Sequence, residues 1–283
     1  MWDFPEALYI DIGQYIEKLV RWMLVNMSGF FDAVTQVIIW VLLRVQDGLA
    51  FIPWWAYVAL VFLAGWRLGN WKRGLSYAFM LFLVGAFGLW GLMIYTLSIV
   101  FVSVFISLLV GIPLGVAMAK FLRFGQILKP ILDAMQTMPS MVYLIPAAML
   151  FGLGLVPAVF ATTIYALPPI IRLTYLGLMN VNKEVKEAGQ SFGSTGWQLL
   201  QKVELPQALP TIMTGINQTT MMAMSMVVLS SMIGARGIGQ EVLTSINRLE
   251  IGRGFNAGFA IVFIAIIFDR ILQGAANRFK TSE

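Results

Sequence analysis

The sequence predicts an all-α protein that crosses a membrane several times. Its 283 residues are 59% hydrophobic and only 12% charged, about half the charged fraction that is usual in a soluble domain. Several apolar stretches have the roughly 17 to 25 residues that a helix needs to cross a bilayer. These stretches are too long and continuous for barrel strands, and lipid leaves the backbone no other way to satisfy its hydrogen bonds.

Residues 1–52 predict a region that lies at the membrane surface. From Leu8 to Met23, apolar side chains recur at helical spacing, and charged side chains lie on the opposite side of the same helix. This pattern is typical of a helix in the membrane interface. A second apolar segment, residues 33–43, is bounded by charges and is short for a span. We therefore predict that it is interfacial as well.

From residue 53 onward, seven membrane spans are predicted. They cover residues 53–69, 74–91, 94–119, 137–153, 157–178, 209–234 and 255–274. Because residues 75–119 carry no charge and are long enough for two helices, a tight turn is expected near residues 88–91. Prolines interrupt the fourth and fifth spans, which indicates either ordinary kinks or a pair of bent helices at a transport path.

The distribution of basic residues predicts the orientation. With seven spans, thirteen of the nineteen basic residues fall on the side of the chain's C-terminus. Positive charge is retained on the cytoplasmic side of membrane proteins, so residues 1–52 are expected outside and the C-terminus in the cytoplasm. The outer loop at residues 234–254 is then a short, glycine-rich connector whose charges could receive a delivery protein.

Cysteine and histidine are both absent, and this narrows the chemistry. The absence excludes disulfides, metal sites built on those residues and Ser-His or Cys-His nucleophiles, so no catalytic residue and no metal site is predicted. The excess of basic residues is explained by orientation, and no nucleic-acid partner is expected. No removable signal peptide is expected either, since the first residues lack a basic segment and a cleavage site.

The polar stretch EAGQSFGSTGWQLLQKVELP, residues 187–206, lies between two apolar runs on the predicted cytoplasmic side. Its pattern predicts a short helix, a break at Gly193 and Gly196, and a second short helix that ends at Leu205-Pro206. Glu187 could pair with Lys183. Because large apolar side chains stand at its tip, the loop is expected to dock a partner.

The loop resembles the EAA loop of binding-protein-dependent ABC importer permeases. The pattern of that family is E-A-A-x3-G-x9-I-x-L-P, and this sequence departs from it only at Gly189 and Val203. The residues that the resemblance assigns to ATPase coupling are Glu187, Ala188, Gly189, Ser191, Phe192, Gly193, Trp197, Val203, Leu205 and Pro206. Residues 95–273 as a whole look like the glycine betaine and proline (quaternary amine) branch of the family, most like permeases of the OpuA type.

The resemblance implies a type I ABC importer transmembrane fold in a prokaryotic cell membrane. It implies an importer core at residues 92–275 with the loop at 183–206, two accessory helices at 53–91 and a cytoplasmic tail at 276–283. The implied partners are a second copy of the chain, two cytoplasmic ATPase subunits and an extracellular solute-binding protein. ATP and magnesium would bind the ATPase, because this chain has no phosphate-binding G-x-x-x-x-G-K-[ST] sequence.

A path for the substrate is predicted from uncharged polar and aromatic residues within the spans. The residues are Ser140, Tyr143, Tyr165, Asn217, Gln218 and Thr220. Aromatic faces attract a quaternary ammonium group, whereas hydrogen bonding between helices explains many such residues in any bundle. In this family the selective site belongs to the binding protein, so the permease need not hold a tight one.

Three classes of function follow from these observations. The first is the membrane subunit of an ATP-driven importer of glycine betaine, choline, carnitine or a proline-like solute. The second is a carrier or channel driven by an ion gradient, which would call for carboxylates within the spans or an internal repeat. A membrane enzyme is the third, and it is disfavoured by the scarcity of carboxylates in the spans.

Overall fold

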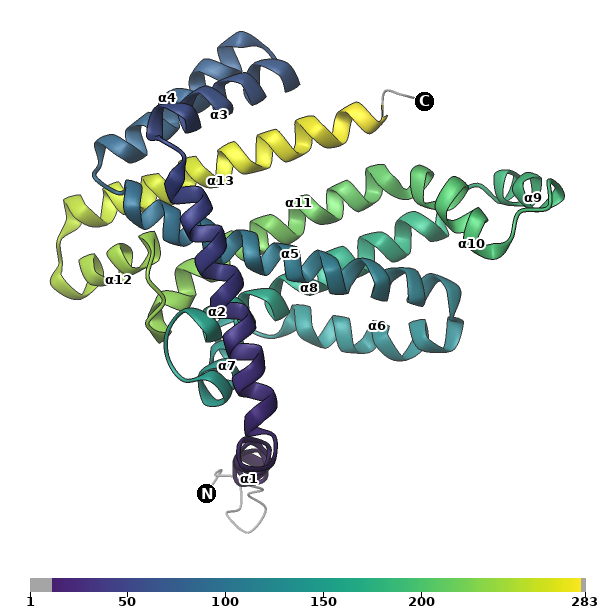
Figure 1. Ribbon diagram of the computed structural model, residues 1–283, viewed down its shortest axis with the longest axis horizontal. Coiled ribbons are helices and arrows are strands. Elements are labelled where there is room, and N and C mark those ends of the chain that lie inside the picture. The colour runs from purple at the N-terminus through teal and green to yellow at the C-terminus, as the bar shows by residue number, and fades with distance from the viewer. Residues whose placement is uncertain (1–11, 281–283) are drawn as a thin grey trace, which may run out of the picture.

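The computed structural model describes residues 12–280, and all regular structure in that range is helical (Figure 1). The elements are α1 (Ile12–Asn26), α2 (Ser28–Phe51), α3 (Trp54–Leu68), α4 (Trp71–Ala86), α5 (Trp90–Lys120), α6 (Leu122–Thr137), η2 (Ser140–Tyr143), α7 (Leu144–Phe151), α8 (Leu155–Met179), α9 (Lys183–Ser191), α10 (Gly196–Leu199), η3 (Leu200–Glu204), α11 (Leu205–Ser230), η4 (Ser231–Ile233), α12 (Ile238–Arg248) and α13 (Ile251–Lys280). Leu8 of the predicted first helix and residues 281–283 of the predicted tail lie outside the described residues, and residues 276–280 continue α13.

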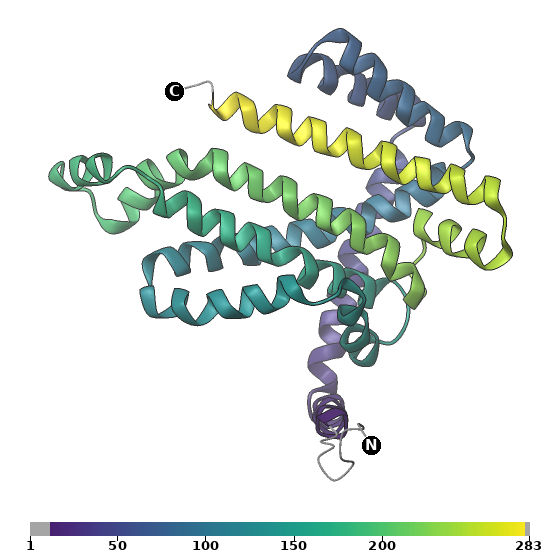
Figure 2. The ribbon, with the colours of Figure 1, turned by 180° about the vertical axis from the view of Figure 1, so that it is seen from behind.

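The helices α5, α8 and α11 form the centre of the molecule, and α13 lies beside α11 (Figures 1 and 2). Small residues let α5 and α8 approach closely, since a Cβ at Gly115 would lie only 2.6 Å from the Cβ of Thr174. The hydroxyl of Ser103 on α5 donates a hydrogen bond to the Val159 carbonyl on α8 at 3.2 Å. Small residues and hydroxyl bonds of this kind hold helices together where lipid supplies no hydrophobic driving force.

The helices α3 and α4 form a hairpin whose crossing depends on glycine. A Cβ at Gly74 would lie 2.5 Å from the carbonyl oxygen of Phe62. The side chain of Asn70 caps α4 by accepting a hydrogen bond from the Arg73 amide at 2.9 Å. The hairpin packs against α13, where a Cβ at Gly274 would lie 2.9 Å from the Cβ of Leu68.

The predicted turn between the second and third spans is confirmed. The helix α4 ends at Ala86, α5 begins at Trp90, and Gly88 between them has a φ of 74°. Such a backbone angle is readily adopted only by glycine.

Five helices are long and apolar enough to cross a membrane, and six if the bent pair α6–α7 counts as one span, within residues 12–280. The five are α2, α5, α8, the continuous stretch from α10 through η4, and α13, while α3 is a shorter apolar helix. The predicted spans at 94–119, 157–178, 209–234 and 255–274 correspond to α5, α8, α11 and α13. The total of seven spans and the orientation stay predictions.

The prediction of a fourth span at residues 137–153 is wrong. The chain forms α6 over Leu122–Thr137, and the helical stretch Ser140–Phe151 that follows is bent by 109° from it. The charged residues of α6 made its sequence read as a loop, but Asp133 forms an ion pair with Arg172 on α8 and Leu132 is buried. The fifth span, by contrast, is continuous, because Pro168 and Pro169 lie within the unbroken α8.

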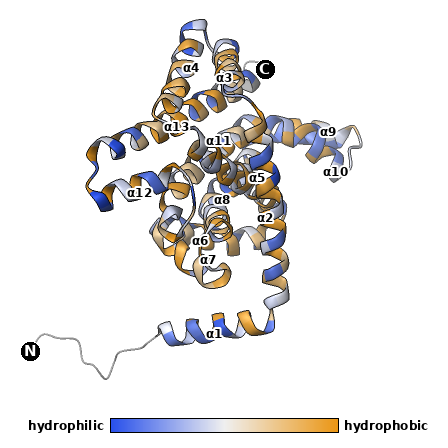
Figure 3. Cartoon of the chain, turned by 60° about the vertical axis from the view of Figure 1, so that its left-hand side comes forward, coloured by the Kyte–Doolittle hydropathy of each residue, from blue (hydrophilic) through white to orange (hydrophobic). Residues whose placement is uncertain are grey.

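The prediction of a short interfacial segment at residues 33–43 is also wrong in its extent. The helix α2 continues through Asp32 and Arg44 from Ser28 to Phe51, because both charged side chains lie on its exposed side. The predicted helical pattern before it is confirmed in α1, which meets α2 at a sharp corner (Figure 3). In Figures 1 and 3, α2 runs crosswise to the central helices.

The expected connector at residues 234–254 contains a helix. The 11-residue α12 packs on α13, and the amide of Ile238 at its start donates a hydrogen bond to the Thr96 hydroxyl on α5 at 2.9 Å. The glycines at 234 and 237 made this stretch read as a loop, but both have positive φ angles and serve the turn that leads into the helix.

Candidate functional site

The loop between α8 and α11, residues 183–206, projects beyond the end of the central helices (Figure 1). The predicted order of helix, glycine break and helix is confirmed, with α9, a turn at residues 192–195 and α10. At the tip, 91% of Phe192 and 65% of Trp197 is exposed. Two large apolar side chains are therefore presented to solvent on a short, helical support.

Two local features define the tip. Gly193 has a φ of 77°, which L side chains rarely adopt, and this angle reverses the chain after α9. Thr195 and Gln198 then form a capping box at the start of α10, in which the Gln198 side chain accepts from the Thr195 amide at 2.9 Å. The tip is thus fixed by backbone geometry rather than by burial.

At position 189 this sequence has glycine where the family pattern has alanine, and the close packing of the loop explains the glycine. A Cβ at position 189 would lie 2.8 Å from Cδ1 of Leu199 and 3.6 Å from Cγ2 of Val203. The absence of a side chain lets α9 lie close against α10 and η3. Val203, the other departure, is half-buried in η3.

A buried carboxylate anchors the base of the loop. Only 6% of the Glu204 side chain is exposed, and its Oε2 lies 2.6 Å from Nζ of Lys120 at the end of α5. Its Oε1 lies 3.6 Å from Nζ of Lys186 on α9, which also donates to the Leu178 carbonyl at 3.0 Å. A buried charge is tolerated when it is paired, so Glu204 connects three separate elements.

Glu204 lies in η3, a single π-helical turn between α10 and α11. Wider turns of this kind are rare and are frequent at functional sites. The prediction that the second short helix ends at Leu205-Pro206 is wrong, because Pro206 lies in the first turn of α11 and the chain stays helical. Proline is tolerated there because the first turn of a helix leaves its amides unpaired.

The ion pairs at the base of the loop are formed by Glu204, which was not predicted, and not by Glu187. Glu187 is exposed and forms no ion pair with Lys183 within residues 12–280, whereas its carbonyl accepts from the Ser191 hydroxyl at 2.9 Å. Ala188 is exposed beside it. Glu204 could not be found from local patterns, because Lys120 is 84 positions away in the sequence.

The residues predicted to line a substrate path lie in two separate places. The rings of Tyr143 and Tyr165 lie edge to face with centroids 5.7 Å apart, and the Tyr143 hydroxyl donates to the Met135 carbonyl. Both belong to an apolar cluster that also includes Met226 on α11. Ser140 is half-buried at the start of η2, at the bend before α7.

The polar residues of α11 form the second group. The side-chain amide of Asn217 donates to Oδ1 of Asp269 on α13 at 2.9 Å. Thr220 bonds to the Ile216 carbonyl of its own helix, and Gln218 is exposed. The pairing of Asn217 with Asp269, which joins α11 to α13, was not predicted.

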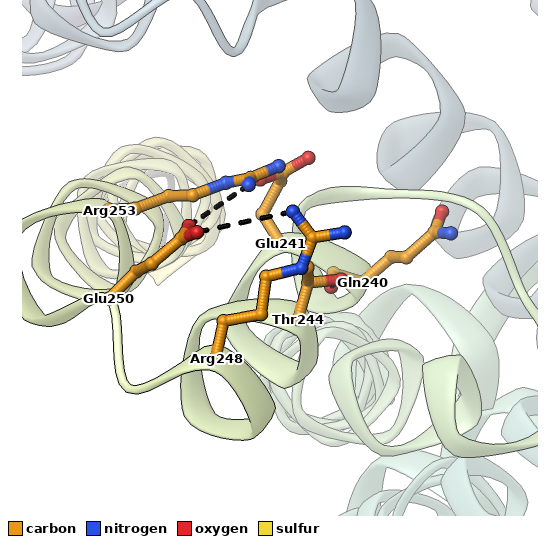
Figure 4. Close-up of polar contacts among 6 residues, drawn as sticks. All are labelled: Gln240, Glu241, Thr244, Arg248, Glu250 and Arg253. Carbon is orange, nitrogen blue, oxygen red and sulfur yellow. Dashed lines mark hydrogen bonds and ion pairs between the residues drawn. The ribbon is translucent and has the colours of Figure 1, made fainter.

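A network of charges closes the corner between α12 and α13 (Figure 4). Nε of Arg253 lies 2.5 Å from Oε2 of Glu241, and its Nη1 lies 3.1 Å from Oε2 of Glu250. Arg248 joins more weakly, with its Nη1 3.9 Å from Oε1 of Glu250. Within residues 12–280 no group of three histidine, cysteine or acidic residues is placed to hold a metal ion.

Curated relatives match the chain over nearly its whole length. The glycine betaine/carnitine transport permease protein GbuB of Listeria monocytogenes is 42% identical over 98% of this chain and 99% of its own. The glycine betaine transport system permease protein OpuAB of Bacillus subtilis is 40% identical over 96% of each chain. The glycine betaine/proline betaine transport system permease protein ProW of Escherichia coli is 40% identical over 95% of this chain and 76% of its own.

Solved structures show the same fold at lower identity. The inward-facing MetNI methionine ABC transporter aligns with a TM-score of 0.56 and 23% identity, over 66% of this chain and 92% of the other. An amino acid ABC transporter crystallised with histidines aligns with a TM-score of 0.54 and 19% identity, over 68% of this chain and 92% of the other. These matches support the type I importer fold for the central helices.

The family profile covers the end of α5, all of α8 and α11, nearby helices and the projecting loop. It is described as the binding-protein-dependent transport system inner membrane component, and it matches residues 111–280. With this match and relatives at 40–42% identity, the chain belongs to the family of binding-protein-dependent transport system inner membrane components, as a multi-pass membrane permease.

Proposed function

We propose that this chain is the membrane-spanning permease subunit of an ATP-driven importer that moves glycine betaine, or a closely related quaternary amine, into the cytoplasm. The observation that carries the proposal is the projecting loop, with an exposed apolar tip and a buried, ion-paired base. The relatives that match nearly the whole chain are named as permeases of glycine betaine, which supports the substrate.

The loop is proposed to dock a separate ATPase subunit. The side chains of Phe192 and Trp197 would leave water on docking, and each large aromatic residue buries enough surface to anchor an interface. The chain binds no cofactor in this proposal, and ATP with magnesium binds the ATPase.

The geometry supports transmission of force from the ATPase to the membrane helices. Movement of the tip would pass through α9 and α10 to α8 and α11, which are continuous in sequence with the loop. Glu204 adds a third connection, to Lys120 at the end of α5. A packed, ion-paired base moves as a rigid body, which is what a switch between inward-facing and outward-facing states requires.

The proposed assembly holds two copies of this chain, two ATPase subunits and an extracellular solute-binding protein. The binding protein would dock on the face opposite to the loop, where the charged corner between α12 and α13 offers Arg248 and Glu250 for a reversible, steered contact. The proposed substrate path passes Ser140, Tyr143 and Tyr165 on one side, where aromatic faces suit a trimethylammonium group. Asn217, Gln218 and Thr220 would border it from α11.

The test is transport by the purified complex in liposomes, with radiolabelled glycine betaine and the binding protein outside and ATP inside. Uptake that needs ATP, and that stops when the ATPase subunits are omitted, is the expected result. Unlabelled choline, carnitine and proline are added as competitors of glycine betaine. Those that reduce its uptake show which class of solute is transported. Uptake by the chain alone without ATP, driven by an ion gradient, would identify a secondary carrier and overturn the proposal.

A further inference from the structure

A polar cavity of about 370 Å³ lies where the end of the α3–α4 hairpin meets α13. Its polar lining comes from two helices, with Arg73 and Tyr77 on α4, and Arg270, Gln273 and Asn277 on α13. The rest of the wall is formed by Gly65, Leu68, Gly69, Ile271 and Gly274. The cavity belongs to neither the projecting loop nor the proposed substrate path.

The cavity is positively charged. Two arginines line it and no aspartate or glutamate does. Asp269 lies next to the cavity and contacts two of its lining residues, since its Oδ1 accepts from Gln273 at 2.6 Å and its Oδ2 lies 3.9 Å from Nε of Arg270. The same Oδ1 also accepts from Asn217 at 2.9 Å, so one carboxylate offsets part of the positive charge of the two arginines. The Arg278 guanidinium donates to the carbonyl oxygen of Arg67, which precedes Leu68 of the cavity wall, so one further cation lies near the cavity.

Close packing of glycines builds this cavity and keeps its shape. A Cβ at Gly65 would lie 2.8 Å from the Cα of Gly74, and one at Gly274 would lie 2.9 Å from the Cβ of Leu68. The three helices therefore approach more closely than side chains would allow. Arg73 lies over Gly69, where a Cβ would come within 2.9 Å of its Cδ. Arg73 and Arg270 thus line one cavity from two different helices.

The surroundings of the cavity place it at the level of lipid headgroups. Trp66 and Trp71 flank it with more than half of each side chain exposed, and Nζ of Lys72 lies 5.9 Å from the centre of the Trp71 ring. Exposed tryptophan and lysine mark the membrane interface. Leu63 and Leu75 expose apolar surface elsewhere on the same hairpin, which is available to an acyl chain.

The connection between α3 and α4 and the C-terminal end of α13, which border the cavity, lie toward the same end of the molecule as the projecting loop (Figures 1 and 2). Under the proposed function this is the cytoplasmic end, where anionic lipids attract basic segments. A phosphate diester offers the acceptor oxygens that arginine, tyrosine and side-chain amides donate to. A free anion would meet the same donors, but would make no use of the exposed apolar surface of the hairpin.

We propose that this cavity is a binding site for the headgroup of an anionic phospholipid, with Arg73 and Arg270 holding the phosphate. The lipid would join the α3–α4 hairpin to α13 by bridging cations that otherwise repel. This role does not depend on the transported solute.

The experiment measures the lipid that stays bound to the full-length chain. The chain is purified in mild detergent, incubated with an equimolar mixture of phosphatidylglycerol and phosphatidylcholine, and examined by native mass spectrometry. We expect phosphatidylglycerol to be retained in preference to phosphatidylcholine. The double variant Arg73→Gln/Arg270→Gln should weaken that binding about 30-fold, at about fivefold for each arginine near a lipid surface.

Two further variants test whether the loss of binding comes from the cavity itself, from the lower net charge or from misfolding. Arg123→Gln removes one exposed cation from α6, outside the cavity, and should leave retention unchanged. Arg73→Lys keeps the charge and should keep most of the binding, which shows that loss in the glutamine variant is not misfolding. Equal retention of both lipids, or an equal loss with Arg123→Gln, would overturn the proposal.

A soluble competitor distinguishes the two sources of phosphate. Inorganic phosphate at millimolar concentration should not displace phosphatidylglycerol, because it lacks the acyl chains. Displacement at that concentration would mean that the cavity binds a water-soluble anion, and the lipid assignment would be wrong. Since no ATP or substrate enters this measurement, its failure would leave the proposed transport function untouched.

Discussion

Glu204 holds a buried charge that two lysines balance from different helices. Its Oε2 lies 2.6 Å from Lys120, and the side chain is 6% exposed. Glu204→Gln would leave both lysines facing a neutral group. Losing one partner of a buried pair costs about 3–5 kcal/mol, but the Lys120 side chain is 36% exposed and water compensates in part. We expect a loss of about 1–3 kcal/mol of unfolding free energy.

The measurement for Glu204→Gln is denaturant or thermal unfolding of the purified chain in detergent. Lys202→Gln is the control, because Lys202 lies in the same turn but is exposed and forms no ion pair in the described part of the chain. The control should change the unfolding free energy by less than about 0.5 kcal/mol. Equal stabilities of the two variants would show that the ion pairs do not anchor the loop.

Gly193 sets the direction of the loop tip through its backbone angle alone. Its φ is 77°, and no atom lies within 4 Å of a Cβ placed there. Gly193→Trp should therefore fold, with a local cost of about 1–2 kcal/mol for the left-handed angle. Because the tip would be displaced and enlarged, ATP-driven uptake should fall about tenfold or more.

Uptake per folded complex is the quantity to compare for Gly193→Trp. Gly29→Trp on α2 is the matched control, since a Cβ there also meets open space and Gly29 has no positive φ. Full uptake in Gly193→Trp, with the ATPase still bound, would refute the assignment of the tip as the docking element.

At the scale of elements, the α3–α4 hairpin rests on one close crossing. A Cβ at Gly74 would lie 2.5 Å from a backbone oxygen of α3, whereas a Cβ at Gly85 on the same helix would lie 3.5 Å from the Trp90 ring, an ordinary contact. Gly74→Ala should lower the unfolding free energy by about 1–3 kcal/mol through overpacking. Gly85→Ala should raise it by up to about 1 kcal/mol, because alanine favours the helix.

Thermal unfolding of the two alanine variants, side by side, tests the crossing. If Gly74→Ala proves as stable as Gly85→Ala, the helices must separate without cost, and the hairpin does not depend on this glycine.

Helices could be predicted from the sequence where a single property, such as a long uncharged stretch, was enough to identify them. Residues 75–119 carry no charge, so two apolar helices and the turn at Gly88 followed directly. The helix α6 was missed because its charges argue for a loop, and only the fold brings Asp133 to Arg172. The helix α12 was hidden in the same way by the glycines before it.

The candidate site likewise has one part that could be predicted from the sequence and one part that could not. The helix, glycine and helix order of the loop is local, so spacing revealed it, and the exposed tip followed from two aromatic residues in a polar stretch. Its anchoring by Glu204 depends on a lysine 84 positions away. Contacts of this kind, like that of Asn217 with Asp269, cannot be read from one sequence, because many pairings of the same residue types are possible.

At the scale of the whole molecule, the predicted orientation can be tested cleanly, because the chain has no cysteine. Gln190→Cys on the projecting loop and Asn247→Cys on α12 both place a thiol at an exposed position. A maleimide that does not cross membranes should label Asn247→Cys in intact cells, and Gln190→Cys only after the membrane is opened. The reverse pattern would invert the orientation, and labelling of both in intact cells would contradict it.

The crosswise helix α2 has a consequence for how the chain is assembled during synthesis. Its inner face packs on α5 and α8, and Phe31 meets Phe151 with ring centroids 5.7 Å apart. All of these partners emerge from the ribosome after α2. This long helix, made early, thus reaches its full set of contacts only after α5, α7 and α8 have been made. The helices of this protein therefore cannot all pack in the order in which they are synthesised.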